Sequence, residues 1–253
     1  MSVKTRLTTF AAIVIFLTSL SALGDEVEQQ ESPVQVACVG DSITYGARLN
    51  DPANDSYPAI LQKLLGQGHK VANLGVGGCT LIRKGKPTVW NQLRRMRRGK
   101  PSIIVISLGT NDTCGGDRKC WEHKDDFPND CRDLLDALLA LPSKPRIWIC
   151  APSPMVVETA GLSSSRKKNL EQRNPRLQEL IVIIRTVAEE KNVGFIDLNT
   201  PLSKKPELFT AKDGVHPNKA GYLAIAELVY AALRESAASD GKIANRPNAR
   251  AVK

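Results

Sequence analysis

The amino-acid sequence predicts an α/β fold, a three-layer α/β/α sandwich in which one five-stranded parallel sheet carries helices on both faces. Five short apolar runs alternate along the chain with longer amphipathic runs, as strands and helices do in such sheets. The run "SIIVIS" at residues 102–107 is apolar nearly throughout, which is typical of a strand that is buried on both faces. No internal repeat or second domain is visible.

The elements follow from these runs in order. The predicted strands are "VQVACV" (34–39), "KVANLG" (70–75), "SIIVISLG" (102–109), "RIWIC" (146–150) and "VGFIDL" (193–198). The predicted helices are "YPAILQKLLG", "TVWNQLRRMRR", "NDCRDLLDALLAL", "RLQELIVIIRTVAEEKN" and "NKAGYLAIAELVYAALRESA". In the last of them, Ile225, Leu228, Val229 and Ala232 form one apolar stripe at helical spacing. We expect residues 155–169 to form a loop at the carboxyl end of the fourth strand.

The first 24 residues have the layout of a secretory signal peptide. Lys4 and Arg6 precede an apolar stretch over about residues 10–20, and small residues lead to Gly24. That stretch is too short to span a bilayer comfortably, so we expect cleavage and no stable membrane insertion afterwards; a retained anchor is the alternative. The exported chain would be periplasmic or extracellular. The predicted segments are a signal peptide (1–24), a linker (25–33), one α/β domain (34–238) and a disordered basic tail (239–253).

The net charge of +9 does not indicate a nucleic-acid partner, because it is concentrated at the termini. Without the +2 of the signal segment and the +3 of residues 240–253, only +4 remains for residues 25–239. The one dense basic run, "RRMRRGK" at 94–100, is predicted to be a solvated helix face, with contact to an acidic polymer as the alternative.

Six cysteines in an exported chain permit disulfides without demanding them. Cys38 and Cys150 lie in apolar strand runs and are expected to be buried and free. Cys114 and Cys120 bound the loop "CGGDRKC", and we hypothesise that they pair, because its two glycines let the thiols approach. No CxxC or paired His/Cys spacing for zinc appears, so a metal cofactor is not expected.

Polar motifs stand at the carboxyl ends of the strands, where ligands bind in open α/β sheets. They are "GDS" after the first strand, "NLGVGG" after the second, "GTND" after the third and "DGVHP" before the last helix. A serine nucleophile needs a base, and the chain offers three histidines. His69 precedes the second strand and His123 lies in a charged loop. His216 follows Asp213 by three residues and precedes Pro217, which suits the first turn of a helix. Taken alone, His216 is better interpreted as a helix-cap residue.

The four blocks together resemble the SGNH hydrolase family, also called GDSL esterases and lipases. "GDSITYG" matches its nucleophile block, although Ile43 stands where the name implies leucine, and the resemblance extends from about Val34 to Ala238. It implies a flavodoxin-like five-stranded parallel sheet and a serine esterase that needs no cofactor. "TCGGDRKCW" after "GTND" departs from the pattern, so the border of the pocket there is not predicted.

The resemblance assigns catalytic roles to Ser42 as nucleophile, His216 as base and Asp213 as the carboxylate that orients it. The oxyanion hole would consist of the N–H groups of Ser42 and Gly78 and the amide of Asn111. Each also has a purely structural interpretation: Ser42 as a turn residue, Gly78 as a positive-φ residue and Asn111 as a loop cap. For Asp41 and Asp112 we favour the structural interpretation, bracing of the loops.

The predicted activity is hydrolysis of short-chain acetyl esters on carbohydrate, with a small-molecule or polysaccharide ester as substrate. The residues near the motifs mix aromatic and polar groups, as sugar-binding surfaces do: Tyr45, Arg83, Lys84, Trp90 and Trp121. More narrowly, the chain resembles bacterial carbohydrate O-acetylesterases of the sialate O-acetylesterase or acetylxylan esterase type. The alternatives are a lysophospholipase or thioesterase of the same fold and a catalytically dead carbohydrate-binding protein.

Overall fold

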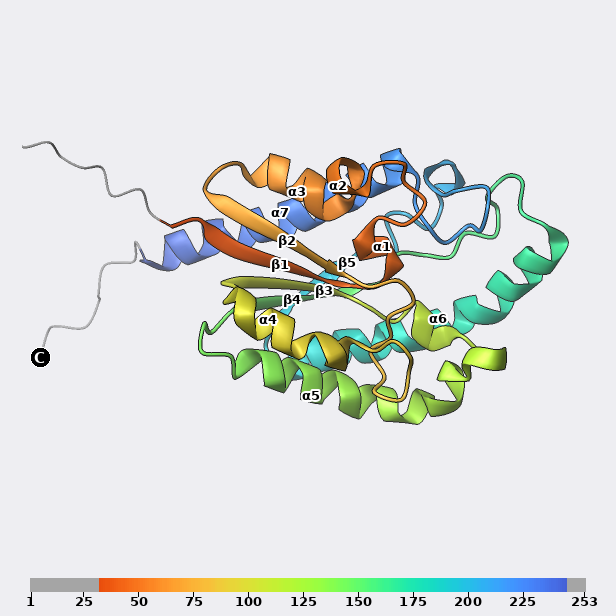
Figure 1. Ribbon diagram of the computed structural model, residues 1–253, viewed down its shortest axis with the longest axis horizontal. Coiled ribbons are helices and arrows are strands. Elements are labelled where there is room, and N and C mark those ends of the chain that lie inside the picture. The colour runs from red at the N-terminus through yellow and green to blue at the C-terminus, as the bar shows by residue number, and fades with distance from the viewer. Residues whose placement is uncertain (1–31, 245–253) are drawn as a thin grey trace, which may run out of the picture. The chain divides into compact units, whose positions relative to one another are not determined.

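The structure, a computed structural model, describes residues 32–244. One five-stranded parallel sheet runs through these residues in the order β2-β1-β3-β4-β5 (Figure 1). Its strands are β1 (Val34–Gly40), β2 (His69–Gly75), β3 (Ile103–Ser107), β4 (Arg146–Ala151) and β5 (Gly194–Asp197). The predicted sheet is confirmed, and each strand lies within two residues of its expected bounds.

The strand order reverses between β1 and β3, and this reversal positions the site. The chain passes from β1 outward to β2 and then returns to the other side of β1 to form β3. Loops that leave the carboxyl ends of β1 and β3 therefore diverge, and a crevice opens between them. "GDS" follows β1 and "GTND" follows β3, so the order of the strands brings these two motifs to the same place.

Two core clusters lie on opposite faces of the sheet because alternate strand residues point to opposite sides. On β1, Val36 and Cys38 join one cluster, while Ala37 and Val39 join the other. The β3 residues are buried throughout, which explains why "SIIVIS" shows no polar alternation.

Helices cover both faces (Figure 1). The first cluster packs beneath α3 and α7, and the second beneath α4 and α5, while α6 contributes to both. The α-helices are α1 (Ser42–Tyr45), α2 (Pro52–Asp55), α3 (Tyr57–Leu65), α4 (Leu93–Gly99), α5 (Phe127–Leu139), α6 (Ser164–Glu190) and α7 (Lys219–Ala244). The short 3₁₀ helices are η1 (Val89–Gln92), η2 (Asn111–Thr113), η3 (Gly116–Arg118), η4 (Cys120–Asp126) and η5 (Pro206–Leu208).

Two expectations differ from the structure. The expected loop at 155–169 ends early, because Ser163 caps α6: its hydroxyl accepts a hydrogen bond from Arg166 N at 3.2 Å, and 164–169 are helical. Helix α7 continues to Ala244, so it enters the segment 239–253 for which we expected no structure. The predicted signal peptide and all but the last two residues of the linker lie outside the described residues.

The basic run at 94–100 lies on α4 as expected. Met96 is buried beneath the helix, and the arginines on either side of it are exposed. Within residues 32–244, no helix is long and apolar enough to cross a membrane.

Candidate active site

Ser42 is the first residue of α1, directly beyond the end of β1. The Asp41 carboxylate caps this one-turn helix by accepting a hydrogen bond from Ile43 N at 2.8 Å. Gly40 permits the tight turn, since a Cβ atom there would collide with the Thr44 hydroxyl and with Ser107 O of β3. The turn therefore holds the half-buried Ser42 hydroxyl at the open crevice.

His216 and Asp213 are held together by the backbone of the "DGVH" segment. Asp213 Oδ1 accepts hydrogen bonds from Val215 N at 3.0 Å and from His216 N at 2.9 Å. Its other oxygen, Oδ2, accepts from His216 Nδ1 at 2.8 Å. The three-residue spacing thus has a physical reason, because one carboxylate both closes the turn and contacts the imidazole that follows it.

The structure brings all three expected catalytic side chains together. His216 Nε2 lies 2.8 Å from Ser42 Oγ, across 174 residues of sequence. Burial by itself would raise the pKa of the Asp213 carboxyl, but the bonds from the His216 ring and from two backbone N–H groups outweigh burial and hold this pKa well below its ordinary value. Asp213 is therefore ionised at neutral pH. A nucleophile, a base and an orienting anion in this chain can carry out acyl transfer.

Two backbone donors at the site have no protein acceptor. Among the residues that the structure describes, the N–H groups of Ser42 and Gly78 enter no hydrogen bond. Gly78 has φ +75°, a conformation that favours glycine. Unpaired N–H groups beside a serine hydroxyl are suited to receive the oxygen of a tetrahedral intermediate.

The Asn111 side chain lies at the same site with its amide already engaged. Its Nδ2 donates to Asp41 Oδ2 at 3.2 Å and to Cys79 O at 3.1 Å. Nδ2 carries only two hydrogens, so donation to a bound oxyanion requires one of these contacts to lengthen. The amide links the "GDS", "NLGVGGC" and "GTND" segments.

Asp41 and Asp112 brace the loops, as the structural interpretation predicted. Asp112 Oδ1 accepts from Leu81 N at 3.0 Å and from Ile82 N at 2.9 Å, so η2 is tied to the segment that follows Gly78. Burial raises the pKa of the Asp41 carboxyl to about 6, although the Ile43 N–H and the charges of His216 and Arg118 oppose the rise. Burial likewise raises the pKa of Asp112 to about 7.

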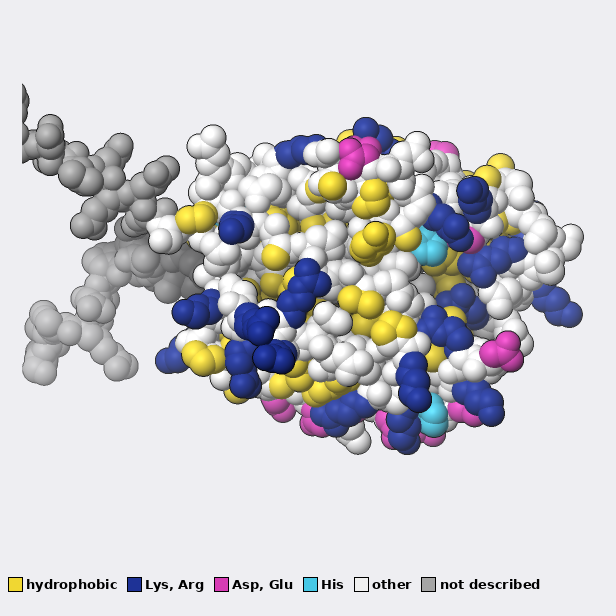
Figure 2. Space-filling view, in the orientation of Figure 1, with side chains coloured by type: hydrophobic (Ala, Val, Ile, Leu, Met, Phe, Trp, Pro, Cys, Tyr) yellow, Lys and Arg dark blue, Asp and Glu magenta, His cyan; other side chains and the backbone are white. Residues whose placement is uncertain are grey.

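Three arginines that the sequence analysis gave no role surround the site. Arg118 donates from Nη1 to Asn111 Oδ1 at 2.9 Å and from Nη2 to Gly78 O at 2.6 Å. Arg48 Nε lies 3.2 Å from Asp213 Oδ2, and Arg166 Nε donates to Asp213 O at 2.8 Å. Figure 2 shows Lys and Arg side chains gathered on this side of the molecule, between α1 and the first turns of α6. Motif spacing could not reveal these contacts, because each arginine comes from a loop or helix outside the four blocks.

The other two histidines lie away from the site. His69 begins β2 at the amino end of the sheet, and His123 lies in η4. Of the aromatic residues expected near the motifs, Trp90 and Trp121 pack against the second core cluster. Trp90 Nε1 also donates to Leu81 O at 2.9 Å, so this ring supports the loop. Tyr45, which is 54% exposed, is the expected aromatic residue that remains free to meet a substrate.

The hypothesised Cys114–Cys120 disulfide is absent, and both thiols are free. The backbone closes this loop instead, since Trp121 N donates to Cys114 O at 2.8 Å. Cys120 is buried, and its sulfur contacts Arg118 O at 3.4 Å rather than the other thiol. The predicted pairing is therefore wrong for this structure. Two glycines let the loop turn, but they do not direct the thiols toward each other.

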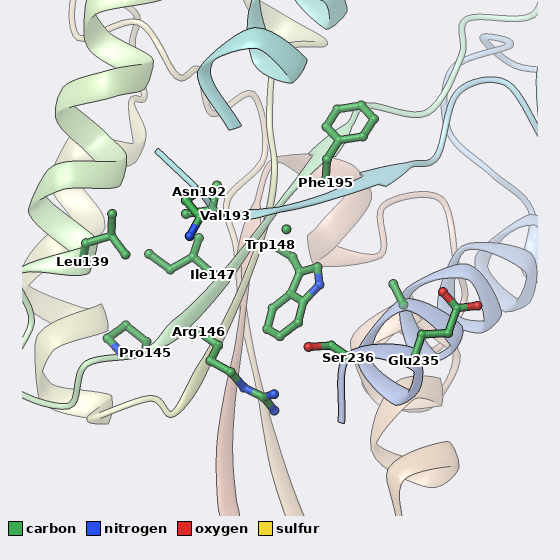
Figure 3. A pocket seen from close by; sticks show the side chains of 12 residues that line it. Leu139, Pro145, Arg146, Ile147, Trp148, Asn192, Val193, Phe195, Glu235 and Ser236 are labelled. Atoms are coloured by element: carbon green, nitrogen blue, oxygen red, sulfur yellow. The ribbon is translucent and has the colours of Figure 1, made fainter. Parts of the chain in front are cut away.

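Within residues 32–244, no group of three His, Cys, Asp or Glu side chains is arranged to hold a metal ion. A pocket of about 570 Å³ lies at the far end of the sheet (Figure 3). Its wall includes Arg146 and Gly194, which begin β4 and β5. Ser42, Asn111 and His216 lie at the opposite, carboxyl end, so this pocket does not belong to the candidate site.

Residues 38–224 match the model of a GDSL-like lipase/acylhydrolase family. An acetylxylan esterase of Xylanibacter ruminicola is 30% identical over 224 residues, which cover 81% of this chain and 44% of the relative. A multidomain esterase of Ruminococcus flavefaciens is 27% identical over 128 residues, which cover 50% of this chain and 15% of that protein. The chain thus spans less than half the length of these relatives.

Solved structures share the fold. A carbohydrate acetylesterase family member from Sinorhizobium meliloti superposes with a TM-score of 0.63 at 22% identity, covering 80% of this chain and 98% of that one. The aryl esterase of M. smegmatis gives a TM-score of 0.61 at 18% identity, covering 80% and 99%. The five-stranded fold predicted from the motifs is therefore also that of known esterases.

Proposed function

Because this chain belongs to the GDSL-like lipase/acylhydrolase family, we propose that it is a carboxylic ester hydrolase that removes acetyl groups from carbohydrate by a Ser-His-Asp mechanism. The observation that carries the mechanism is the continuous hydrogen-bond path from Ser42 Oγ through His216 to Asp213, with both contacts at 2.8 Å. The assignment of a carbohydrate substrate is supported by the similarity to the acetylxylan esterase. The matching region covers 44% of that relative.

In the proposed reaction, Ser42 Oγ attacks the carbonyl carbon of the acetyl ester while His216 Nε2 takes the hydroxyl proton. The carbonyl oxygen becomes an oxyanion and accepts hydrogen bonds from Ser42 N, Gly78 N and the Asn111 amide. The ester C–O bond then breaks, His216 gives the proton to the departing sugar oxygen so that the sugar leaves with a free hydroxyl, and an acetyl-serine remains.

Water completes the cycle. His216 takes a proton from a water molecule, which attacks the acetyl carbon, and the proton then returns to Ser42 Oγ as acetate leaves. Throughout these steps Asp213 holds the imidazole by Nδ1 and stabilises its cationic form. No step needs a metal or an organic cofactor.

The substrate class is tested with a chain-length series of p-nitrophenyl esters, followed by acetate release from acetylated sialic acid, xylan and pectin. The proposal predicts the best turnover on acetate and a steep fall by octanoate. Faster hydrolysis of octanoate or of lysophospholipid would instead indicate the lysophospholipase or thioesterase alternative. Absence of turnover on every ester would leave the non-catalytic carbohydrate-binding alternative.

Export is a second part of the proposal, and it rests on the layout of residues 1–24. Expression of the full chain in a bacterial host, followed by amino-terminal sequencing of the protein from the periplasm or medium, tests it directly. We expect a mature chain that begins near Asp25. A cytoplasmic protein with an intact amino terminus would contradict export and would leave the esterase proposal unaffected.

A further inference from the structure

A pocket of about 360 Å³ beside the candidate site is lined by three guanidinium groups. Arg118, Arg173 and Arg176 form its charged wall, and the side chains of Asn169 and Gln172 and the backbone of the 114–116 turn complete it. No carboxylate is among the residues that line this arginine pocket. Its volume falls in the range of roughly 300–1,000 Å³ typical of sites for small molecules.

The three arginines have neutral partners. Arg173, only 8% exposed, donates to Thr113 Oγ1 at 2.9 Å and to Thr110 O at 2.7 Å. Arg176 Nη1 donates to Thr113 O at 3.0 Å, and Arg118 contacts only an amide oxygen and a carbonyl oxygen. In the described part of the chain, none of these three forms a salt bridge, whereas other arginines do, such as Arg132 with Glu190 at 2.6 Å.

The arrangement concentrates positive charge. Burial lowers the pKa of Arg173, and the neighbouring guanidinium groups of Arg166, Arg118 and Arg176 lower it further because like charges repel. A buried cation without a counter-ion is costly, and attraction to a bound anion offsets both the desolvation cost and the repulsion between the guanidinium groups. The pocket therefore has a physical preference for an anionic ligand.

Two hydrogen-bond links connect the arginine pocket to the catalytic residues. On one side, Arg118 spans from the pocket to Gly78 O and Asn111 Oδ1. On the other, Asn169 Oδ1 accepts from Arg166 Nη1 at 3.0 Å, and Arg166 Nε donates to Asp213 O. A ligand in this pocket is therefore separated from the oxyanion donors by the Arg118 side chain, and from the Asp213 turn by the side chains of Asn169 and Arg166.

We propose that the arginine pocket binds the carboxylate of an acidic sugar unit that neighbours the acetylated unit in the substrate, an inference that rests on the proposed carbohydrate esterase function. Guanidinium groups match a carboxylate because two parallel N–H donors meet its two oxygens. Arg176 is oriented for this by the Trp121 ring, 5.2 Å from its guanidinium carbon. The amides of Asn169 and Gln172 can meet sugar hydroxyls.

The first experiment measures binding without turnover. Calorimetry on the Ser42→Ala protein compares three unacetylated probes: a xylo-oligosaccharide with one glucuronic acid branch, the same oligosaccharide without the branch, and trigalacturonate. At least one acidic probe is expected to bind roughly tenfold more tightly than the neutral one, with the preference weakening at high salt. Equal affinity for all three probes, or no binding of any probe, would overturn the proposal whatever the esterase activity.

The second experiment assigns the preference to the pocket. Arg176→Gln removes one guanidinium, and Gln172→Glu places a competing carboxylate on an exposed helix position where folding should tolerate it. Both are expected to reduce the ratio of acidic to neutral binding by roughly tenfold, while Arg176→Lys retains part of it. Arg98→Gln on α4 is the matched control, because it removes the same charge from an exposed site outside the pocket and should leave the ratio unchanged.

Steady-state kinetics separates this inference from the proposed function. With acetylated glucuronoxylan and acetylated neutral xylan, Arg176→Gln should raise KM for the acidic polymer more than for the neutral one and leave the kcat ratio close to wild type. Esterase activity without this selective KM effect would contradict the pocket alone. Selective binding of the acidic probes without esterase activity would uphold the pocket and contradict the proposed function.

Discussion

Asp213 and Asp112 are both buried near the carboxyl end of the sheet, and each accepts two backbone N–H groups, yet their environments differ. Asp213 also accepts from the His216 ring at 2.8 Å and lies 3.2 Å from Arg48 Nε, and its pKa is depressed. Asp112 is fully buried, its carboxylate accepts from the backbone N–H groups of Leu81 and Ile82, and burial raises its pKa to about 7. Backbone donors alone suffice for bracing, whereas the imidazole and guanidinium partners keep Asp213 ionised for the proposed catalysis.

The largest expected effect is the loss of turnover in Asp213→Asn, which tests the proposed catalytic role of this carboxylate. An amide keeps the shape of the carboxylate, but it removes the negative charge and permits the wrong imidazole tautomer. We expect kcat on p-nitrophenyl acetate to fall by roughly 10³-fold or more. The same substitution in the Ser42→Ala protein should add little, because the residues act as a unit. A loss below tenfold in the single variant would contradict the role of Asp213.

Asp112→Ala should lower the stability of the protein, which tests the bracing role of the other carboxylate. It leaves the N–H groups of Leu81 and Ile82 buried and unpaired, and each unmet donor costs about 1–3 kcal/mol. We therefore expect the free energy of unfolding in urea to fall by about 3 kcal/mol. Asp117→Ala is the control, since Asp117 is exposed in the neighbouring η3 and its loss should change stability by less than about 0.5 kcal/mol. Equal effects of the two substitutions would show that Asp112 does not brace the loop.

Asn111→Ala extends the comparison to two adjacent residues of η2, Asn111 and Asp112, which have different surroundings. Asn111 lies at the site and Asp112 lies beneath it, so the first should affect turnover and the second stability. Loss of one oxyanion donor is expected to reduce kcat by about 10²-fold with little change in KM. An unchanged rate would move the oxyanion role to another donor.

The pH dependence of stability compares the same carboxyl groups without mutation. Because the folded-state pKa values of Asp41 and Asp112, about 6 and about 7, exceed the ordinary value of 3.8, the folded protein retains protons that the unfolded chain releases. Stability from these groups is therefore fully present below about pH 4, and it is lost progressively as the pH rises from about 4 to about 7. We expect the free energy of unfolding to be on the order of 4 kcal/mol higher at pH 5 than at pH 8.

This difference should shrink in Asp112→Asn, whose side chain does not titrate. Asp213 acts in the opposite sense, because its pKa is lowered, but its contribution is lost only below about pH 4, outside this window. A wild-type protein that is more stable at pH 8 than at pH 5 would contradict the raised pKa values.

The sheet could be predicted from sequence because its signals are local. The apolar run of β3 indicates a strand that is buried on both faces, and the alternation of apolar and amphipathic runs indicates a parallel sheet covered by helices. The start of α6 was missed, since the polar segment after Ser163 has no apolar periodicity and depends on a capping hydroxyl. The extension of α7 to Ala244 could not be predicted, because residues 239–244 contain few large apolar residues.

The catalytic side chains could be predicted because they stand in compact motifs at the strand ends. The arginine contacts could not, since Arg118 reaches Gly78 across 40 residues and Arg173 reaches Thr110 across 63. Such contacts depend on the path of an insertion and on helix placement, which no periodicity encodes. The free thiols of Cys114 and Cys120 show the same limit, because spacing alone does not set side-chain direction.

The central claim is that Ser42 is the nucleophile activated by His216. The most direct measurement is mass spectrometry of peptides from the protein after reaction with a fluorophosphonate probe. We predict one adduct, on Ser42, at near-stoichiometric yield in wild type, no adduct in Ser42→Ala, and a greatly slowed reaction in His216→Ala, with all three melting temperatures similar. A folded wild-type protein that remains unlabelled, or an adduct on another residue that persists in Ser42→Ala, would contradict the account.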